Sequence, residues 1–184
     1  MSGSRAKAGF AAAALAAVLA AAVVPAWRSA AGKRRLREGE DVLLAAARQN
    51  DLAARATLLR DAEEVLDTAA EKLPFDPRPP YLLGSAALLR GDFTSALDHY
   101  RRSLAIEERP ETDLNLSRAH TAAGQAEAAA ADALRAVWLA PFMLRDLPSA
   151  VRGPIRQELK NRERLLRLGQ AAVPPLGEEP AALH

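Results

Sequence analysis

Hydrophobic residues recur at three- and four-residue steps through the middle of this chain, which is the spacing of an amphipathic helix. The stripes predict helices over residues 41–60 and 61–73, and prolines at positions 74 and 77 then end the pattern. The spacing resumes in four later segments, which are Tyr81 to Arg90, Phe93 to Ile106, Leu114 to Ala123 and Ala129 to Leu139. The sequence therefore predicts an all-α fold.

A glycine followed by a polar residue separates the two helices of each later pair. These turns are Gly91-Asp92 and Gly124-Gln125, and their glycines lie 33 residues apart (124 − 91). A helical hairpin that repeats at this period cannot bury its apolar face alone and has to stack on a neighbour. We therefore expect a short stack of antiparallel helix pairs.

Small residues occupy matching places in the two hairpins. They are Gly84 and Ala96 in the first hairpin, and Ser117 and Ala129 in the second. A small side chain lets two helix axes approach each other, so we expect helices to cross at these positions. Tyr100 and His120 are expected to fill the space beside the crossings.

Before the hairpins, an uncharged stretch runs from Ala8 to Trp27 and follows Arg5 and Lys7. A helix of about 20 apolar residues can cross the hydrocarbon core of a bilayer. We therefore expect residues 1–37 to hold an N-terminal transmembrane or signal-anchor helix with a basic flank.

The alternative for this segment is a cleaved signal, because small residues precede possible cleavage sites after Ala26 and Ala31. The basic run Lys33-Arg34-Arg35-Leu36-Arg37 is unusual so soon after a signal peptide, so retention as an anchor is favoured. This run places more positive charge after the apolar stretch than before it, which favours a cytoplasmic repeat domain. A basic N-terminus that leads into an apolar stretch is also how export signals begin, and we favour the exported side slightly.

After Pro141 the pattern predicts a capping segment and one more helix, opened by Gly153-Pro154 and ending near Gly169. Arginines and lysine flank the apolar stripe of this helix, and a basic patch for nucleic acid or anionic lipid is the alternative to a cap. Glu158 and Glu163 dilute that charge, and no aromatic residue is interleaved for base stacking. Residues 170–184 contain prolines and are expected to be a disordered tail.

The first clear hairpin resembles the tetratricopeptide repeat (TPR) family. The family pattern pairs a Leu-Gly step on the first helix with an Ala on the second, a large residue four positions later and a Pro twelve positions after that Ala. Leu83-Gly84, Ala96 and Tyr100 match this pattern. Glu108 stands where the proline belongs.

The second hairpin matches the same pattern at Leu116, Ala129 and Pro141. Ser117 replaces the glycine of the pattern, and Ala133 replaces the large residue. Residues 38–77 look like a degenerate unit of the family, because a twelve-residue step to a proline is kept there.

The resemblance implies a right-handed stack whose inner groove holds a peptide or a helix of another protein. The first helices of the two clear units would line that groove. The candidate partner contacts are Arg78, Tyr81, Ser85, Leu88, Asn115 and Arg118. Family members that grip a C-terminal carboxylate use lysines and asparagines, and apart from Asn115 this chain lacks that set, so that specificity is not carried over.

Residues for chemistry are scarce. The chain has no cysteine, three histidines and a formal net charge of only +2, which together disfavour thiolate metal sites, histidine ligand sets and nucleic-acid binding. Acidic residues line up at helical spacing at Asp61, Glu64, Asp67 and Glu71. We interpret them as a solvated helix face rather than a metal site. No catalytic residue, metal, cofactor or small-molecule substrate is expected.

The sequence therefore predicts a single-pass membrane protein with an N-terminal anchor, a TPR-like stack and a C-terminal capping helix. The expected divisions are residues 1–37, 38–77, 78–141, 142–169 and 170–184. Its expected role is that of a scaffold that recruits or organises a protein partner at the membrane. A fixed structural subunit of a cell-envelope complex is the alternative, and an exported enzyme is less favoured.

Overall fold

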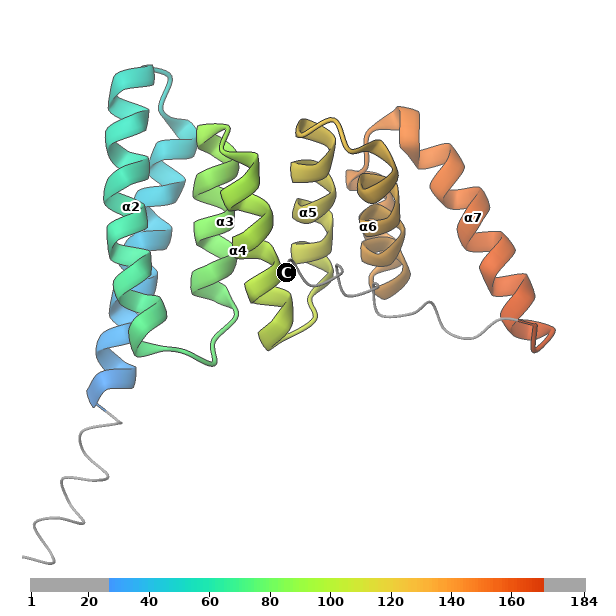
Figure 1. Cartoon of the computed structure of the whole chain (residues 1–184), viewed down its shortest axis with the longest axis horizontal. Helices are drawn as coiled ribbons and strands as arrows, with labels where there is room; N and C mark the ends of the chain where they lie inside the picture. The colour runs from blue at the N-terminus through green and yellow to red at the C-terminus, as the bar shows by residue number, and fades with distance from the viewer. Residues whose placement is uncertain (1–26, 171–184) are drawn as a thin grey trace, which may run out of the picture. The chain divides into compact units, whose positions relative to one another are not determined.

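The computed structural model describes residues 27–170, and this part contains helices and turns but no strand. After a first helix over residues 27–48, the elements are α2 (Leu52–Lys72), α3 (Arg78–Arg90), α4 (Phe93–Ile106), α5 (Pro110–Ala122), α6 (Ala126–Leu139), the 3-10 helix η1 (Pro141–Asp146) and α7 (Ser149–Arg167) (Figure 1). The predicted all-α fold is confirmed. Two compact units divide the chain between Ala86 and Ala87, inside α3.

The first unit is built on a hairpin of the first helix and α2. One core cluster contains Leu36, Leu66, Ala69, Leu73 and Leu83, and a second contains Leu43, Ala46, Leu59, Ala62 and Ala86. Residues early in the first helix meet residues late in α2, and later residues of the first helix meet earlier ones of α2. The two helices are therefore antiparallel.

Two glycines set how closely these helices approach. A Cβ atom built on Gly32 would lie 2.7 Å from Leu73 Cγ and 2.9 Å from Lys72 Cβ. A Cβ atom on Gly39 would lie 2.7 Å from Leu66 Cγ. The missing side chains thus allow a backbone-to-side-chain contact that alanine would block.

The break between these helices lies earlier than the sequence predicted. The helices were expected over residues 41–60 and 61–73, but the first one ends at residue 48 and α2 begins at Leu52. The Asp51 carboxylate caps α2 by accepting a 2.7 Å hydrogen bond from the amide of Ala54. Two guanidinium nitrogens of Arg55 donate to the carbonyl oxygen of Gln49, at 3.0 and 2.9 Å. Hydrogen bonds at the helix cap determine where the turn lies, and the spacing of apolar residues in an alanine-rich segment does not indicate that position.

The two predicted glycine turns are confirmed. Gly91 and Gly124 have φ angles of 83° and 76°, the left-handed region that closes a helix at low cost only for glycine. Behind each of them the chain returns a backbone hydrogen bond to the preceding helix, from Asp92 to Ala87 at 2.9 Å and from Gln125 to His120 at 2.8 Å. Both turns therefore end their helices in the same way.

The core of the second unit runs from α5 through α6 and η1 into α7. It contains Leu114, Ala133, Leu134, Ala136, Val137, Ala140, Met143, Leu147 and Ile155. The predicted capping helix thus packs on α6 and η1. It begins at Ser149 rather than at Gly153, because the Pro148 carbonyl accepts hydrogen bonds from the amides of Val151 and Arg152 and starts the helix. Pro154 consequently lies inside α7, where it removes one backbone hydrogen bond.

The predicted membrane segment, Ala8 to Trp27, lies outside the described residues except for Trp27. Residues 170–184 also fall outside them, apart from Gln170. Among the helices over residues 27–170, none is both long enough and apolar enough to cross a bilayer. The first helix continues through the predicted boundary at residue 37, so the basic run Lys33 to Arg37 forms part of a packed hairpin.

Candidate binding groove

Four of the predicted contact residues follow one face of α3 at three- and four-residue steps: Arg78, Tyr81, Ser85 and Leu88. The Arg78 guanidinium is held by the Asp76 carboxylate through hydrogen bonds of 2.9 and 2.6 Å. The Ser85 hydroxyl donates to the Tyr81 carbonyl at 3.1 Å. Tyr81, Ser85 and Leu88 are half-buried, so this face of α3 is only partly open.

The other two predicted contacts, Asn115 and Arg118, lie together on α5. The Arg118 guanidinium donates a 2.7 Å hydrogen bond to Oδ1 of Asn115. Arg118 is exposed and Asn115 is half-buried. The amide of Asn115 therefore holds an exposed cation at a fixed place on the helix.

Arg118 lines an apolar groove of about 570 Å³ between α5, α6 and the segment that leads into α7. The α5 wall is formed by Leu114, Ser117, Arg118, Thr121 and Ala122, and the α6 side by Gly124, Ala126, Ala129, Ala130 and Ala133. Asp146, Leu147, Pro148 and Val151 close the third side. The groove has an apolar floor with a cation, Arg118, and an anion, Asp146, among its lining residues.

Of the predicted contact residues, only Arg118 lines the groove. Ala126, Ala129, Ala130 and Ala133 share one face of α6, but Ala128 and Ala131 place alanine on other faces as well. Such a segment does not distinguish a groove wall from a helix crossing. The contribution of Asp146 and Val151 depends on how the chain turns after α6. A local pattern carries no signal for that turn.

A buried carboxylate lies between α5 and α6 but outside the groove. Asp113 is only 1% exposed, and its Oδ1 atom is 3.6 Å from Nε of Arg135. The same Arg135 nitrogen donates to Glu108 at 2.8 Å. Burial raises the pKa of Asp113 to about 7, and the neighbouring Arg135 opposes this shift.

A second acid, the half-buried Asp132 of α6, faces the histidine of α5. His120 Nδ1 and Asp132 Oδ2 are 3.4 Å apart, in an orientation that does not form a hydrogen bond. Burial raises the pKa of Asp132 to about 7, and burial together with Arg101 lowers the pKa of His120. The packing role predicted for His120 is confirmed, whereas its acidic neighbour was missed because the two lie on different helices.

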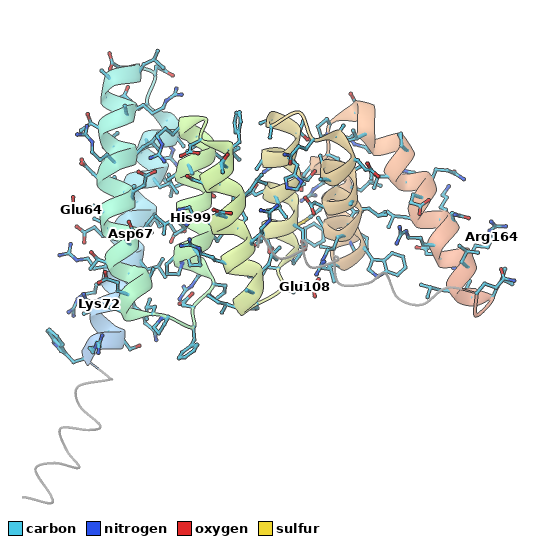
Figure 2. The ribbon with its side chains drawn as sticks, viewed as in Figure 1. Glu64, Asp67, Lys72, His99, Glu108 and Arg164 are labelled. Carbon is cyan, nitrogen blue, oxygen red and sulfur yellow. The ribbon has the colours of Figure 1, made fainter. Side chains whose placement is uncertain are left out.

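The remaining candidates do not form a reactive site. The side chains of Asp61, Glu64, Asp67 and Glu71 are all exposed on α2, and Figure 2 labels Glu64 and Asp67 there. His99 is half-buried on α4. Across residues 27–170, no three histidine, aspartate or glutamate side chains are grouped to hold a metal ion.

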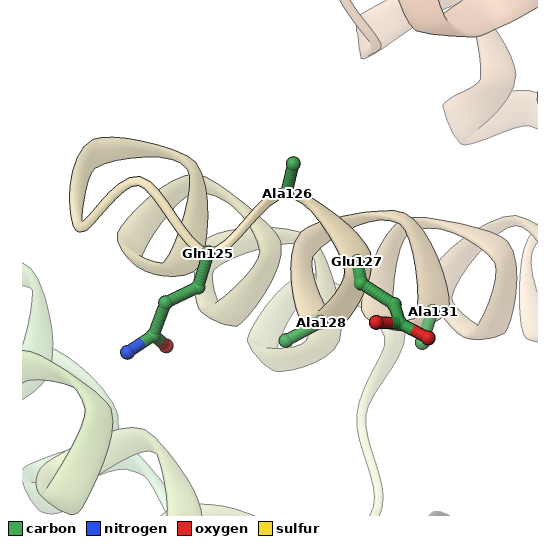
Figure 3. A pocket seen from close by; sticks show the side chains of 5 residues that line it. All are labelled: Gln125, Ala126, Glu127, Ala128 and Ala131. Atoms are coloured by element: carbon green, nitrogen blue, oxygen red, sulfur yellow. The ribbon is translucent and has the colours of Figure 1, made fainter.

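A shallow hollow at the start of α6 is lined by Gln125, Ala126, Glu127, Ala128 and Ala131 (Figure 3). The polar ends of Gln125 and Glu127 do not converge in this view. A ligand site needs polar groups directed at one point, and this surface lacks them. The groove on α5 and α6 is the better candidate.

Comparison with solved structures bears on the fold. A thermophilic TPR protein of Thermus thermophilus superposes with a TM-score of 0.58 over 77% of this chain and 68% of that chain, at 20% sequence identity. The chain has the tetratricopeptide-repeat fold. The TPR likeness seen at Leu83-Gly84 and Ala129 thus corresponds to a real similarity of architecture. No family model and no curated protein matches the sequence.

Proposed function

We propose that the protein is a membrane-anchored TPR scaffold that binds another protein through the groove on α5 and α6. The observation that carries the proposal is the apolar groove of about 570 Å³, lined by alanines and by Arg118 and Asp146. A groove of this kind accepts the apolar side chains of a peptide or helix and orients them with a few charged groups.

The proposed binding energy comes from burying the partner's apolar side chains against Leu114, Leu147 and the alanines. Arg118 supplies direction, because its guanidinium can donate to a carboxylate or to a backbone carbonyl of the partner. Its hydrogen bond to Asn115 holds it in place before binding, which reduces the entropy lost on association.

The face of α3 formed by Arg78, Tyr81, Ser85 and Leu88 is proposed as a second contact region. Arg78 is already paired with Asp76, so it would contribute less to binding than Arg118. Tyr81 and Leu88 offer partly exposed apolar surface. Loss of these contacts is expected to weaken binding less than loss of the groove.

The proposed anchor is the uncharged stretch from Ala8 to Trp27, with the repeats on the exported side of the membrane. Protease treatment of intact cells and of spheroplasts tests the orientation, and the mass of the mature protein tests cleavage. Degradation of the repeats only after the outer barrier is opened, with residues 1–31 still present, supports the proposal. Protection in spheroplasts would place the repeats on the cytoplasmic face.

The groove is tested by photo-crosslinking in cells from Thr121, an exposed residue of the groove, with exposed Arg102 on α4 as the control position. The variant Ala130→Arg fills the groove, whereas Ala131→Arg changes the next exposed residue, which does not line it. We expect one partner to crosslink from Thr121, and Ala130→Arg but not Ala131→Arg to abolish it.

Equal crosslinking from both positions, or equal loss in both arginine variants, would contradict the groove assignment. Partner exchange, measured on the purified complex, distinguishes the two candidate roles. Exchange of the partner with added competitor fits a recruiting scaffold, whereas co-purification in a fixed ratio without exchange fits a structural subunit of an envelope complex.

A further inference from the structure

A second hollow, of about 380 Å³, lies in the first unit between the first helix and the last turns of α2. Its lining residues are Ala31, Arg34, Arg35, Glu38, Thr68 and Lys72. Three of these side chains are cationic, and they come from two different helices. Figure 2 shows Lys72 at the end of α2 beside the beginning of the first helix.

The close contact at Gly32 fixes the geometry of this pocket. Because Gly32 has no side chain, the backbone of the first helix rests against Lys72 and Leu73, where an added Cβ would lie 2.9 Å from Lys72 Cβ. Arg34 and Arg35 follow within one helical turn of this contact. The cations are therefore brought to one hollow by the packing of the hairpin.

The charge of the pocket is only partly compensated. Arg35 donates a 2.8 Å hydrogen bond to Oε2 of Glu38, which neutralises one cation with the one acid that lines the pocket. The side chains of Arg34 and Lys72 have neither a hydrogen bond nor an ion pair within residues 27–170. Glu38 is paired with Arg35, so the hollow keeps two cations that have no acidic partner, which is a suitable environment for a phosphate group.

Exposed aromatic residues mark the same end of the hairpin. Trp27, at the beginning of the first helix, is 65% exposed. Phe75 is 90% exposed and follows Leu73, which packs against Leu36. Aromatic side chains beside cations are typical of the boundary between headgroups and hydrocarbon in a membrane.

We propose that the pocket formed by Arg34, Arg35, Thr68 and Lys72 binds the phosphate of an anionic phospholipid headgroup. The choice of a lipid over free phosphate rests on the exposed Trp27 and Phe75 and on the membrane anchoring proposed above. The site adds lipid selectivity to the anchor, and it holds the first repeat hairpin against the bilayer surface.

The test uses the full chain mixed with vesicles of phosphatidylcholine alone, or of phosphatidylcholine with phosphatidylglycerol. Flotation with pure phosphatidylcholine vesicles measures the anchor. Acylation of lysines by a water-soluble ester, read by mass spectrometry, measures occupancy of the pocket at Lys72. Lys160, an exposed residue of α7, is the internal reference.

Phosphatidylglycerol is expected to slow acylation of Lys72 about fivefold relative to Lys160. The contact of one cation with an anionic surface favours the bound state about fivefold, and the Lys72 amine cannot react while it holds that contact. The variant Arg34→Gln should remove this protection. Arg37→Gln is the matched control, since Arg37 is an exposed cation of the same run that does not line the pocket. Circular dichroism confirms that both variants keep their helical content.

The possible failures are distinguishable. A chain that floats with phosphatidylcholine but shows no phosphatidylglycerol-dependent protection of Lys72 overturns the pocket and leaves the anchor intact. Equal protection of Lys72 in Arg34→Gln and Arg37→Gln would mean that the whole basic run is attracted to the membrane, which also overturns the pocket. Equal protection of Lys72 by inorganic phosphate added with phosphatidylcholine vesicles would overturn the choice of a lipid headgroup. A chain that floats only with phosphatidylglycerol, and only with Arg34 present, supports the pocket and disproves the anchor, whereas no flotation with either vesicle disproves both.

Discussion

The Ser117 hydroxyl donates a 2.7 Å hydrogen bond to the backbone carbonyl oxygen of Ala129, and so ties α5 to α6 at the point where they cross. Both residues are buried and small. Their positions were predicted as crossing points from the repeat pattern alone. Where that pattern has a glycine, this chain uses the serine for close approach and adds a hydrogen bond between the helices.

We expect Ser117→Ala to lower the free energy of unfolding by about 1 kcal/mol, the usual net worth of one buried hydrogen bond. Ser117→Val should cost more, roughly 1–3 kcal/mol, because the added methyl groups overpack the crossing. Thr94→Ala is the control, since it removes an exposed hydroxyl from α4. Urea unfolding followed by circular dichroism measures all three, and equal stability of Ser117→Ala and Thr94→Ala would contradict the role of the bond.

Gly39 makes a different crossing possible, and alanine there tests it. A Cβ at Gly39 would lie 2.7 Å from Cγ of Leu66, which is fully buried and cannot move aside. We expect Gly39→Ala to destabilise the first unit by roughly 1–3 kcal/mol although alanine favours helix.

Gly153→Ala is the matched control for this prediction. Gly153 lies in α7, and nothing lies within 4 Å of the position that its Cβ would take. The same substitution there should change the stability by less than about 1 kcal/mol, because the gain in helix propensity is opposed by crowding between the new Cβ and the ring of Pro154. The thermal midpoint should therefore fall more for Gly39→Ala than for Gly153→Ala, and an equal change in both would show that the first helix does not pack closely at Gly39.

The repeat hairpins could be predicted because their signals are local. Gly91 and Gly124 mark turns by their own conformational freedom, and the apolar residues on either side of them keep a helical period. The first helix gave no such signal. Its contact face includes Gly32, Leu36 and Gly39. Glycine adds no hydrophobicity, so this face shows no apolar stripe. The basic residues between these positions therefore predicted the flank of a membrane segment rather than a packed helix.

The groove was only partly predictable for a related reason. Arg118 and Asn115 lie on the first helix of a recognisable unit, so the resemblance pointed to them. Asp146 reaches the groove only because η1 turns the chain back after α6, and Asp132 meets His120 only because α5 and α6 cross. Contacts between elements depend on tertiary packing, which no short-range spacing encodes.

Glu108 replaces the proline of the repeat pattern and pairs with Arg135 of α6. Arg135 also lies next to the buried Asp113, so removing the charge of Glu108 should change the pKa of Asp113. Glu108 raises the pKa of Asp113. Glu108→Gln removes that repulsion and leaves Arg135 to pair with Asp113 alone, and both effects should lower the pKa of Asp113. The stability change should be small, about 1 kcal/mol or less, because the Glu108 pair is partly exposed.

Carboxyl NMR titration of Asp113 in the two proteins measures this shift directly. Glu107→Gln is the control, because Glu107 is the adjacent exposed acid and makes no ion pair with residues 27–170. An unchanged pKa of Asp113 in Glu108→Gln, or an equal change in both variants, would show that the charge of Glu108 does not act on the buried acid.

The buried Asp113 and the half-buried Asp132 also predict how stability depends on pH. In the folded chain the pKa values of Asp113 and Asp132 are about 7, whereas an unperturbed aspartate has a pKa of 3.8. Between these values the folded state holds protons that the unfolded state releases, so the contribution of both acids to stability is lost as pH rises from about 4 to about 7. The lowered pKa of His120 acts in the opposite direction. The contribution of His120 to stability is lost as pH falls below 6.5, the pKa of an unperturbed histidine.

Comparing wild type with Asp113→Asn isolates one acid from this balance. Asparagine does not ionise, so the variant should lose less stability than wild type between about pH 5 and about pH 8, with a difference of roughly 1–3 kcal/mol. Asp98→Asn, which changes an exposed aspartate of α4, should keep the wild-type slope. Urea unfolding at several pH values gives the slopes, and parallel curves for wild type and Asp113→Asn would mean that Asp113 is ionised in the folded chain throughout this range. Arg135 would then compensate for burial, and the junction of α5 and α6 would be an ordinary ion pair rather than a proton-holding site.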